Sequence, residues 1–256
     1  MPVLEIELIP VMSDNYIALL HDPATGATAA VDPGVSEPVM DALTARGWGL
    51  THILVTHHHT DHVGGIPALK AATSCWVVGA EADSRRIPGL DIAVNGGDTV
   101  VLGDAVAQVF AVPGHTSGHI AYWFPDSAAL FCGDTLFSIG CGRLFEGTAR
   151  QMWDSLCLLR QLPDDTRVYC AHEYTLANIK FALSIDPGNQ VLRCRRDEAE
   201  SLRARHLPTV PSTLAMERAA NPFLRADTAD LRHALGMPEG DPAQVFAAIR
   251  RAKDSF

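Results

Sequence analysis

This 256-residue sequence lacks the features that define several classes of protein. No stretch reaches the roughly 18 uncharged apolar residues that a membrane-spanning helix requires, so we expect no membrane partner. Residues 1–10 alternate like a strand and show no positive leader followed by an apolar run, so no secretory signal is expected. The net charge is −10, with 20 Lys and Arg against 30 Asp and Glu. This balance disfavours nucleic-acid binding, because phosphate recognition needs a basic surface.

Cysteine pairs of the C-x-x-C type are also missing, although the chain contains six cysteines. They are widely spaced, and several lie within apolar runs. This distribution predicts reduced thiols in or near the core and a cytoplasmic protein. The six are Cys75, Cys132, Cys141, Cys157, Cys170 and Cys194.

The charge is unevenly distributed along the chain. Residues 1–175 hold 8 Lys and Arg against 20 Asp and Glu, whereas residues 176–256 hold 12 against 10. The second part includes four arginines in a helix-like stretch, and the simplest interpretation places them on an exposed helix surface. They are Arg195, Arg196, Arg203 and Arg205.

Short strand-like runs, separated by turn signals, dominate the first two-thirds of the chain. Strands are expected at residues 3–9, 16–20, 27–31, 52–56, 76–78, 99–102, 105–112, 120–124, 129–132 and 168–171. Helices are expected at residues 38–46, 62–72 and 149–162, with Thr148 as a cap for the last of these.

The pattern changes after His172. Helices are expected at residues 176–185, 190–206 and 242–251, and no further strand pattern follows. The simplest assembly is an α/β (α+β) chain with two β-rich layers covered by helices, followed by a helical appendage.

A dense group of metal-binding side chains follows the strand-like residues 53–56. Residues 57–62 read H-H-H-T-D-H, and imidazole and carboxylate are the ligands that hold borderline divalent cations such as zinc. Burying so many titratable groups without a cation would be costly. Two neighbouring ions need more donors than one loop gives, and three candidates each follow a strand-like run. Two metal sites with one shared ligand are therefore predicted from seven donors: His57, His59, Asp61, His62, His115, Asp134 and His172.

The local geometry of this loop follows from the backbone. In an extended chain alternate side chains share a face, so His57, His59 and Asp61 are expected on one side and His58 on the other. A helix that begins near Asp61 would turn His62 toward a second ion. As an alternative, Asp61 could serve as the cap of that helix.

Two further residues can support the ligands. Asp32 ends a strand, where it can orient a ligand histidine or form the turn of an Asp-Pro-Gly sequence. His119 lies four residues after His115, but Pro113 and Gly114 argue against a helical H-x-x-x-H pair. A structural or supporting role is therefore expected for His119.

The donor pattern resembles that of a known superfamily. Residues 56–62, with the G-H-T, G-D-T and A-H-E triplets around His115, Asp134 and His172, resemble the H-x-H-x-D-H signature and its partners in the metallo-β-lactamase superfamily. The resemblance implies an αββα sandwich with a dinuclear site at one edge of the sheets. It also implies that His57, His59 and His115 bind one metal, that Asp61, His62 and His172 bind the other, and that Asp134 bridges both.

A second set of motifs resembles the glyoxalase II family, the hydroxyacylglutathione hydrolases. The matching segments are residues 141–148 (C-G-R-L-F-E-G-T), 172–175 (H-E-Y-T), 221–223 (N-P-F) and 250–254 (R-R-A-K-D). The resemblance implies hydrolysis of S-D-lactoylglutathione to D-lactate and glutathione. It implies a catalytic domain over residues 1–172 and a helical substrate-binding domain over residues 173–256. The implied glutathione contacts are Arg143, Phe145, Tyr174, Arg250 and Lys253.

Two of these positions depart from the family pattern. Arg143 stands where the family has lysine, which keeps the charge and adds a fork that can hold a carboxylate through two bonds. Phe145 stands where the family has tyrosine, and a lost hydrogen bond costs about 0.5 to 1.5 kcal/mol. Weaker glutathione binding is therefore expected, not loss of activity. Arg250 and Lys253 share a face of an expected helix, and without the resemblance they would be solvated terminal charges.

The expected chemistry rests on two cations beside the carboxylates of Asp61 and Asp134, which are the predicted catalytic residues. Each ion lowers the pKa of bound water from about 15.7 toward about 7, so a metal-bridging hydroxide exists at neutral pH without a protein base. An ion can also polarise the thioester carbonyl and stabilise the oxyanion. The leaving thiol has a pKa of about 8.5 and needs no strong acid. Zinc is the expected metal, and iron or manganese also suit these donors.

Rival functions compete for the same donors. A lactonase is the leading alternative, because ring-ester hydrolysis can use the same hydroxide. A β-lactamase and a one-iron persulfide dioxygenase are further candidates. A metal-binding or redox module without hydrolysis is disfavoured because three ligands per ion leave open coordination positions. An RNA-processing nuclease is disfavoured by the acidic charge of residues 1–175. We expect a monomer that acts on a small-molecule glutathione thioester.

Overall fold

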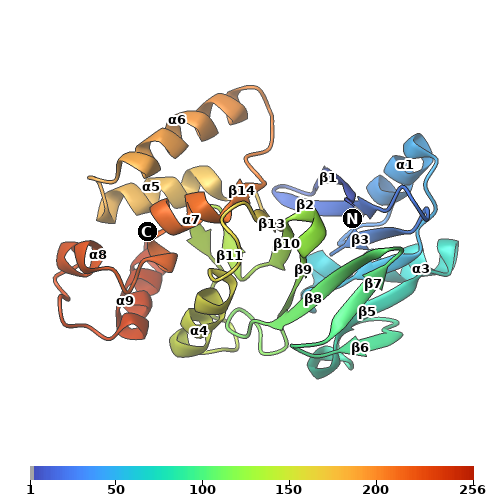
Figure 1. The fold of residues 1–256 in the computed structure, drawn as a ribbon, viewed down its shortest axis with the longest axis horizontal. Helices are drawn as coiled ribbons and strands as arrows, with labels where there is room; N and C mark the ends of the chain where they lie inside the picture. Colours follow the sequence, from blue (N-terminus) through green and yellow to red (C-terminus); the bar gives the residue numbers. More distant parts are fainter. Residues whose placement is uncertain (1–2) are drawn as a thin grey trace. The chain divides into compact units, whose positions relative to one another are not determined.

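The computed structural model describes residues 3–256, which form two compact units. The first unit comprises residues 3–111 and 117–133, and the second comprises residues 112–116 and 134–256. Figure 1 traces the helices and strands of both units along the chain. Within the described residues, no helix is long and apolar enough to cross a membrane.

The first unit begins with a six-stranded sheet in the order β1-β2-β3-β4-β5-β6. Its strands are β1 (Glu5–Val11), β2 (Asn15–His21), β3 (Thr28–Val31), β4 (His52–Leu54), β5 (Trp76–Ala80) and β6 (Ile92–Val94). The first three strands are antiparallel, and β3 to β6 run parallel to one another. Parallel neighbours need crossover connections, which here contain α1 (Glu37–Arg46), α2 (Thr60–Val63), α3 (Ile66–Thr73) and η1 (Glu81–Asp83).

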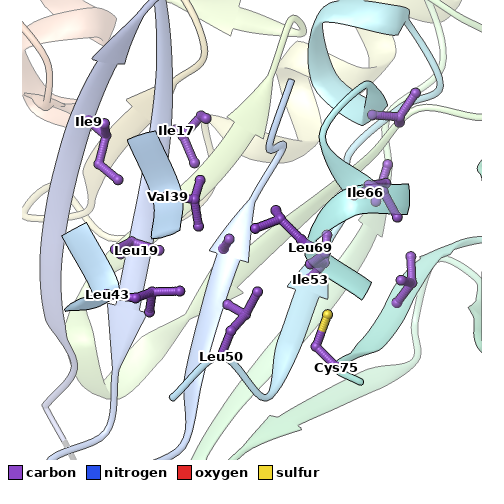
Figure 2. Packing of buried hydrophobic residues seen from close by; sticks show 14 of the residues in the cluster. Ile9, Ile17, Leu19, Val39, Leu43, Leu50, Ile53, Ile66, Leu69 and Cys75 are labelled. Atoms are coloured by element: carbon purple, nitrogen blue, oxygen red, sulfur yellow. The ribbon is translucent and has the colours of Figure 1, made fainter. Parts of the chain in front are cut away.

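One face of this sheet packs against helices. Ile17 and Leu19 alternate along β2 and therefore point to the same face. Val39 and Leu43 lie four residues apart on α1, so they form a stripe that packs in the same cluster. Figure 2 shows this cluster continuing to Ile66 and Leu69 of α3. Full burial of such a side chain contributes about 1.5 to 3 kcal/mol to the stability of the folded state. The packed cluster therefore holds the strands that precede the predicted ligands firmly in place.

Four antiparallel strands form a second layer of the first unit. They are β7 (Thr99–Leu102), β8 (Ala105–Ala111), β9 (Ile120–Phe124) and β10 (Ala129–Gly133), with η2 (Pro125–Ser127) between the last two. Buried and exposed residues alternate along most of β8, as in a strand with one face on the core. Tyr122 of β9 links the layers, because its hydroxyl donates to the Val55 carbonyl oxygen at 2.9 Å. Burial raises the pKa of Tyr122, so this donor stays protonated.

The second unit is mainly helical. Its helices are α4 (Ala149–Leu159), α5 (Thr175–Ile185), α6 (Gln190–Ala204), α7 (Leu214–Ala220), η3 (Pro222–Leu224), α8 (Ala229–Ala234) and α9 (Pro242–Asp254). Its strands are the antiparallel pair β11 (Leu136–Phe137) and β12 (Gly140–Cys141), and the pair β13 (Arg167–Cys170) and β14 (Ser212–Thr213). Thr148 caps α4 as predicted, in a reciprocal capping box with Gln151. Helix α5 packs on α6, and α9 packs on α4.

The single helix predicted over residues 62–72 is wrong. Helix α2 ends at Val63, and α3 begins at Ile66. The two glycines between them approach other backbone segments closely: a Cβ on Gly65 would lie 2.6 Å from the Pro33 carbonyl oxygen. Tertiary packing, which the local periodicity does not encode, therefore breaks the helix at this point.

Two expectations for the second unit are also wrong. A strand does follow residue 172, because β14 pairs with β13. Arg195 is buried, not exposed on a helix surface, and it donates to the Thr209 carbonyl oxygen at 2.5 Å and to the Ser138 hydroxyl at 3.2 Å. Helical periodicity does not predict where its partners, Thr209 and Ser138, lie in the fold. The expected elements also omit β6, β11, β12, α7 and α8.

Most cysteines lie in the core, as predicted. Cys75, Cys132, Cys141 and Cys170 are buried, whereas Cys194 is exposed. Burial raises the pKa of the Cys141 thiol to about 11 and that of Cys170 to about 12. Both thiols therefore stay protonated and weakly nucleophilic at neutral pH.

Candidate metal centre

In the first unit, the predicted ligands lie on the segment that joins β4 to α2. The backbone of His59 is extended, with φ −59° and ψ 145°, and α2 begins at the next residue. Alternate side chains therefore share a side, and His57 Nε2 lies 3.1 Å from His59 Nδ1. The first helical turn brings His62 Nε2 to 3.5 Å from Asp61 Oδ2. The structure thus brings His57 together with His59, and Asp61 together with His62.

Asp61 is not the cap of α2, and that alternative is wrong. His59 holds the N-cap position, and Asp61 lies within the first turn. Its Oδ2 instead accepts a hydrogen bond from Asn15 Nδ2 at 3.0 Å. The sequence-based set of site residues omits Asn15. An asparagine directly before the apolar run of strand β2 is the signal that could have identified it.

Asp32, at the end of β3, supports the same segment. Its Oδ1 accepts from the Thr56 amide at 2.7 Å, and its Oδ2 accepts from the Thr56 hydroxyl at 2.6 Å. Oδ2 also lies 3.1 Å from His62 Nδ1, a contact that favours a proton on Nδ1 and leaves the Nε2 lone pair for a metal. The Asp-Pro-Gly turn forms as well, with the Gly34 amide donating to the Asp32 carbonyl at 2.9 Å. Asp32 therefore forms the turn and also contacts His62, one of the predicted ligands.

His58 and His119 make supporting contacts. His58 Nδ1 lies 2.9 Å from Oδ2 of the buried Asp83, a carboxylate that also pairs with Arg86. The His119 ring stacks on the His57 ring with centroids 4.6 Å apart. His119 Nδ1 lies 3.0 Å from the Ile120 carbonyl oxygen, to which it donates. The contacts of His119 agree with the structural or supporting role expected from the sequence, and His58 pairs with Asp83, which is not one of the predicted ligands.

In the second unit, Asp134 lies between two histidines. His115 Nε2 is 3.4 Å from Asp134 Oδ2, and His172 Nε2 is 3.4 Å from Asp134 Oδ1. All three side chains are buried. Each carboxylate oxygen faces one imidazole nitrogen, an arrangement in which one carboxylate can serve two ions.

The hydrogen bonding of His115 fits the presence of a cation. His115 Nδ1 donates to the Arg143 carbonyl oxygen at 2.8 Å, so Nε2 of the neutral ring carries a lone pair. That lone pair faces an acceptor oxygen of Asp134 in a buried setting, which is repulsive unless a positive charge is present. Imidazole and carboxylate donors suit zinc, iron or manganese. The His and Asp groups are therefore of the metal-binding type.

The segment after β12 packs tightly against these ligands. The Gly142 amide donates to the Thr135 carbonyl oxygen at 3.3 Å. A Cβ on Gly142 would lie 1.9 Å from the Asp134 carbonyl oxygen and 3.1 Å from His115 Nδ1. The position therefore requires glycine, because any larger residue would displace backbone next to both predicted ligands.

Two of the predicted substrate contacts are aromatic side chains next to these histidines. The Tyr174 ring stacks on the His172 ring, with centroids 4.8 Å apart and an interplanar angle of 4°. The Phe145 ring meets the His115 ring edge-on at 5.1 Å. Tyr174 is 37% exposed and Phe145 is 61% exposed. Part of each ring is therefore accessible to solvent beside the predicted ligands.

The predicted arginine contacts differ in exposure. The Arg143 side chain is 65% exposed, and its Nε lies 3.8 Å from Asp254 Oδ1. Arg250 is only 5% exposed, and it donates to Asp254 and to the Cys141 carbonyl oxygen. The sequence-based set of site residues omits Asp254, although it ends the R-R-A-K-D motif and pairs with both arginines.

Lys253, the third predicted cationic contact, lies on α9. Its Nζ donates to the Ala177 carbonyl oxygen at 3.0 Å and lies 5.4 Å from the centroid of the Phe181 ring. Burial lowers the pKa of Lys253, and the charge of Arg250 lowers it further. The ammonium group is therefore partly withdrawn from solvent.

The chain is similar to known proteins over its whole length. Residues 18–172 match the family model of the metallo-β-lactamase superfamily, and residues 173–256 match that of the hydroxyacylglutathione hydrolase C-terminus. A hydroxyacylglutathione hydrolase of Methylococcus capsulatus is 59% identical over 254 residues, which cover 99% of each chain. A hydroxyacylglutathione hydrolase of Rhodospirillum rubrum is 57% identical over 256 residues, which cover 100% of each chain.

A solved structure agrees with these matches. The crystal structure of ETHE1 from Myxococcus xanthus is similar with a TM-score of 0.68 and 28% identity, covering 97% of each chain. The fold is the αββα sandwich of the metallo-β-lactamase superfamily, followed by a C-terminal helical domain, as the motifs predict. Within this superfamily, the chain belongs to the hydroxyacylglutathione hydrolase family.

Proposed function

We propose that this chain is a thioester hydrolase that cleaves S-D-lactoylglutathione to D-lactate and glutathione. The observation that carries the proposal is the full-length similarity to two hydroxyacylglutathione hydrolases, at 59% and 57% identity. The match of residues 173–256 to the C-terminal model of that family adds support, because the superfamily model covers only residues 18–172. We assign catalysis to residues 1–172 and substrate binding to residues 173–256.

We infer that the His and Asp donors bind two divalent ions. The support within the first unit is the pairing of His57 with His59, and of His62 with Asp61. The support within the second unit is the buried carboxylate of Asp134 between two imidazole nitrogens. When bound, the ions would lower the pKa of water and polarise the thioester carbonyl. The proposed ligands are His57, His59 and His115 for one ion, Asp61, His62 and His172 for the other, and Asp134 for both.

The expected metal is zinc, and iron or manganese suit the same donors. The fit rests on imidazole and carboxylate groups alone, which these metals all accept. None of the proposed ligands is a thiolate, so the donor set has none of the soft ligands that would restrict the choice further.

Asp61 is the residue we assign to orienting the attacking water. Its carboxylate is fixed by the hydrogen bond from Asn15, and its side chain is 41% exposed. A carboxylate held in this way can accept a hydrogen bond from water through its remaining lone pairs. The departing thiol has a pKa of about 8.5, so it can leave as a thiolate and no side chain has to protonate it.

Side chains of the second unit would hold the glutathione part. Glutathione carries carboxylates, and the exposed guanidinium of Arg143 can bind one of them through two parallel hydrogen bonds. The Tyr174 hydroxyl could provide a further hydrogen bond, and Lys253 a positive charge. Phe145 offers only an apolar surface, so this chain should bind glutathione less tightly than a chain with tyrosine there.

Hydrolysis of S-D-lactoylglutathione by the purified protein, followed through the thioester absorbance, tests the proposal. We expect turnover by the metal-loaded protein and near-complete loss after chelation or in an Asp134→Ala variant. A fully metallated protein that is inert on this thioester, or that prefers a lactone, would refute the substrate. Turnover that survives complete metal removal would refute the metal-dependent mechanism.

A further inference from the structure

His58 is the one histidine of the H-H-H-T-D-H segment that is not a proposed ligand, and its ring has partners of its own. Its Nδ1 lies 2.9 Å from Asp83 Oδ2, and its Nε2 lies 3.3 Å from Arg86 Nη1. An ionised carboxylate only accepts hydrogen bonds, and a guanidinium only donates them. The ring proton of His58 therefore lies on Nδ1, and the lone pair of Nε2 accepts from Arg86.

The fold brings Asp83 to His58 because two neighbouring parallel strands end at the same edge of the first sheet. Strands β4 and β5 are paired in parallel, so the residues that follow their carboxyl ends lie side by side. His58 follows the end of β4, and Asp83 follows β5 as the last residue of η1. The amides of Arg86 and Ile87 donate to the Asp83 carbonyl oxygen at 2.7 Å and 3.0 Å, which fixes the backbone after η1.

The carboxylate of Asp83 is fully buried and tightly enclosed. Its Oδ2 faces His58, whereas its Oδ1 accepts from Arg86 Nη2. Arg86 Nη2 also donates to the Ser117 hydroxyl at 3.1 Å. A Cβ on Gly118 would lie 2.1 Å from Asp83 Oδ1, so that backbone packs directly on the carboxylate. The ion pair is therefore a rigid partner for the His58 ring, and all of its contacts named here lie within the first unit.

We propose that Asp83 and Arg86 are positioning residues for the metal centre and that they act through His58. Consecutive side chains of an extended segment point to opposite sides, so fixing the middle residue also fixes the direction of its two neighbours. The lock on His58 thereby directs His57 and His59 to a common side. The proposal rests on the proposed function, because it takes His57 and His59 as ligands of one ion.

Three adjacent imidazoles explain why such a lock is needed. Each of them can bind zinc through a ring nitrogen that carries a lone pair, so His58 could compete with its two neighbours for an ion. The guanidinium of Arg86 occupies this lone pair, and a guanidinium is not deprotonated in proteins. The competing donor is therefore removed from the metal centre while its ring anchors the segment.

The experiment measures zinc affinity by chelator competition in the full chain. His58→Gln removes the ring, Asp83→Asn turns one acceptor oxygen into an NH2 donor, and a further chain carries both substitutions. Asp91→Asn is the matched control, because Asp91 Oδ2 also accepts from a backbone amide, that of Val77 at 2.8 Å, and pairs with Lys70 at 2.5 Å. Neither of these partners is a proposed ligand. Thermal unfolding of the metal-free protein gives the stability of each variant.

A second pair of variants tests the other side of the lock. Arg86→Gln removes the guanidinium from His58 Nε2. Arg85→Gln is its matched control, because Arg85 is the exposed residue directly before it. Turnover is measured in all variants with S-D-lactoylglutathione and with S-D-lactoyl-N-acetylcysteamine, a thioester that lacks the glutathione carboxylates.

Positioning through His58 predicts losses that do not add. His58→Gln and Asp83→Asn should each weaken zinc binding about 10-fold, the lower end of the range for supporting residues, and Arg86→Gln should weaken it by a smaller factor. The chain with both His58→Gln and Asp83→Asn should lose no more than His58→Gln alone, because Asp83 then has no ring to hold. In each variant, kcat should fall by the same factor on both thioesters. Asp91→Asn and Arg85→Gln should keep the zinc affinity of the unsubstituted protein.

Several results would overturn the proposal. Losses that multiply to about 100-fold in the chain with both substitutions would show that Asp83 acts independently of His58. An equal loss in Asp91→Asn would reduce the effect to general stability. A loss confined to His58→Gln, with normal zinc affinity in Asp83→Asn and Arg86→Gln, would make His58 itself a ligand.

The zinc titration separates this proposal from the proposed function. It needs no substrate, so a protein that binds zinc but leaves both thioesters intact overturns the substrate, while the zinc affinities still decide the role of Asp83. An unsubstituted protein that binds no zinc would overturn both. If Asp83→Asn fails to fold, the combination of His58→Gln with Arg86→Gln decides by the same criteria.

Discussion

The two units place their predicted metal ligands by different means. In the first unit, four ligands lie between residues 57 and 62, and an extended segment followed by one helical turn sets their relative positions. In the second unit, three ligands are spread between residues 115 and 172, and contacts between distant segments set theirs. The first arrangement is encoded locally, whereas the second depends on tertiary packing.

This difference shows where each ligand set is vulnerable. The first-unit ligands depend on nearby supports such as Asp32, which contacts both Thr56 and His62. The second-unit ligands depend on the segment that follows β12, where Gly142 fits between the backbone of Asp134 and the ring of His115. Substitutions in each region should therefore affect metal binding through different contacts.

The largest effect is expected for Gly142→Ala in the second unit. The new Cβ would lie 1.9 Å from the Asp134 carbonyl oxygen, so backbone next to two ligands must shift. A displacement of about 1 Å can lower kcat/KM by roughly 100-fold, and we expect a loss of that order together with weaker zinc binding. Gly188→Ala is the control, because a Cβ there would meet no atom within 4 Å. Near-normal kcat/KM in Gly142→Ala would contradict the tight packing described for this segment.

A smaller loss is expected for Asp32→Asn in the first unit. In asparagine an NH2 group takes the place of one carboxylate oxygen, and this group donates hydrogen bonds but cannot accept them. It therefore cannot replace Asp32 Oδ2, which contacts both the Thr56 hydroxyl and His62 Nδ1, and the His62 ring loses its orientation. Zinc affinity should fall by about 10-fold, the lower end of the range for such supporting residues. Chelator competition measures this change.

Asp22→Asn provides the matched control for Asp32→Asn. Asp22 also ends a strand and accepts hydrogen bonds from backbone amides, at Ala24 and Asp104. Its hydrogen bonds hold a turn and involve no proposed ligand. Both variants should lose stability, but only Asp32→Asn should lose zinc affinity. Equal zinc affinity in the two variants would remove Asp32 from the support of the metal centre.

The smallest effect is expected for Phe145→Tyr, and it is a gain. The added hydroxyl restores a hydrogen-bonding group that the family pattern has at this position, worth about 0.5 to 1.5 kcal/mol. KM for S-D-lactoylglutathione should therefore fall by roughly 2- to 12-fold. Steady-state kinetics on S-D-lactoyl-N-acetylcysteamine should show no change. An unchanged KM for the glutathione thioester would show that residue 145 does not contact the glutathione part.

The local features of this chain could be predicted from the sequence because they depend on short-range rules. The strands at residues 99–102 and 120–124 have the predicted bounds, and Thr148 caps α4 through a capping box. The shared side of His57 and His59 follows from the alternation of an extended backbone.

The remaining features depend on contacts between distant segments. Gly65 breaks the predicted helix because it packs against the backbone of Pro33. Arg195 is buried because the Thr209 carbonyl lies within its reach. Asn15 contacts Asp61, and Asp254 contacts Arg143, and both partners are distant in the sequence. Periodicity and motif spacing carry no information about such contacts.

Metal content tests the central claim most directly. Protein loaded with zinc, freed of loosely bound ions and shown to be active should contain about two ions per chain by elemental analysis, because the seven proposed donors, with Asp134 as the one they share, would hold two ions. An active protein that retains only one ion per chain would contradict the account.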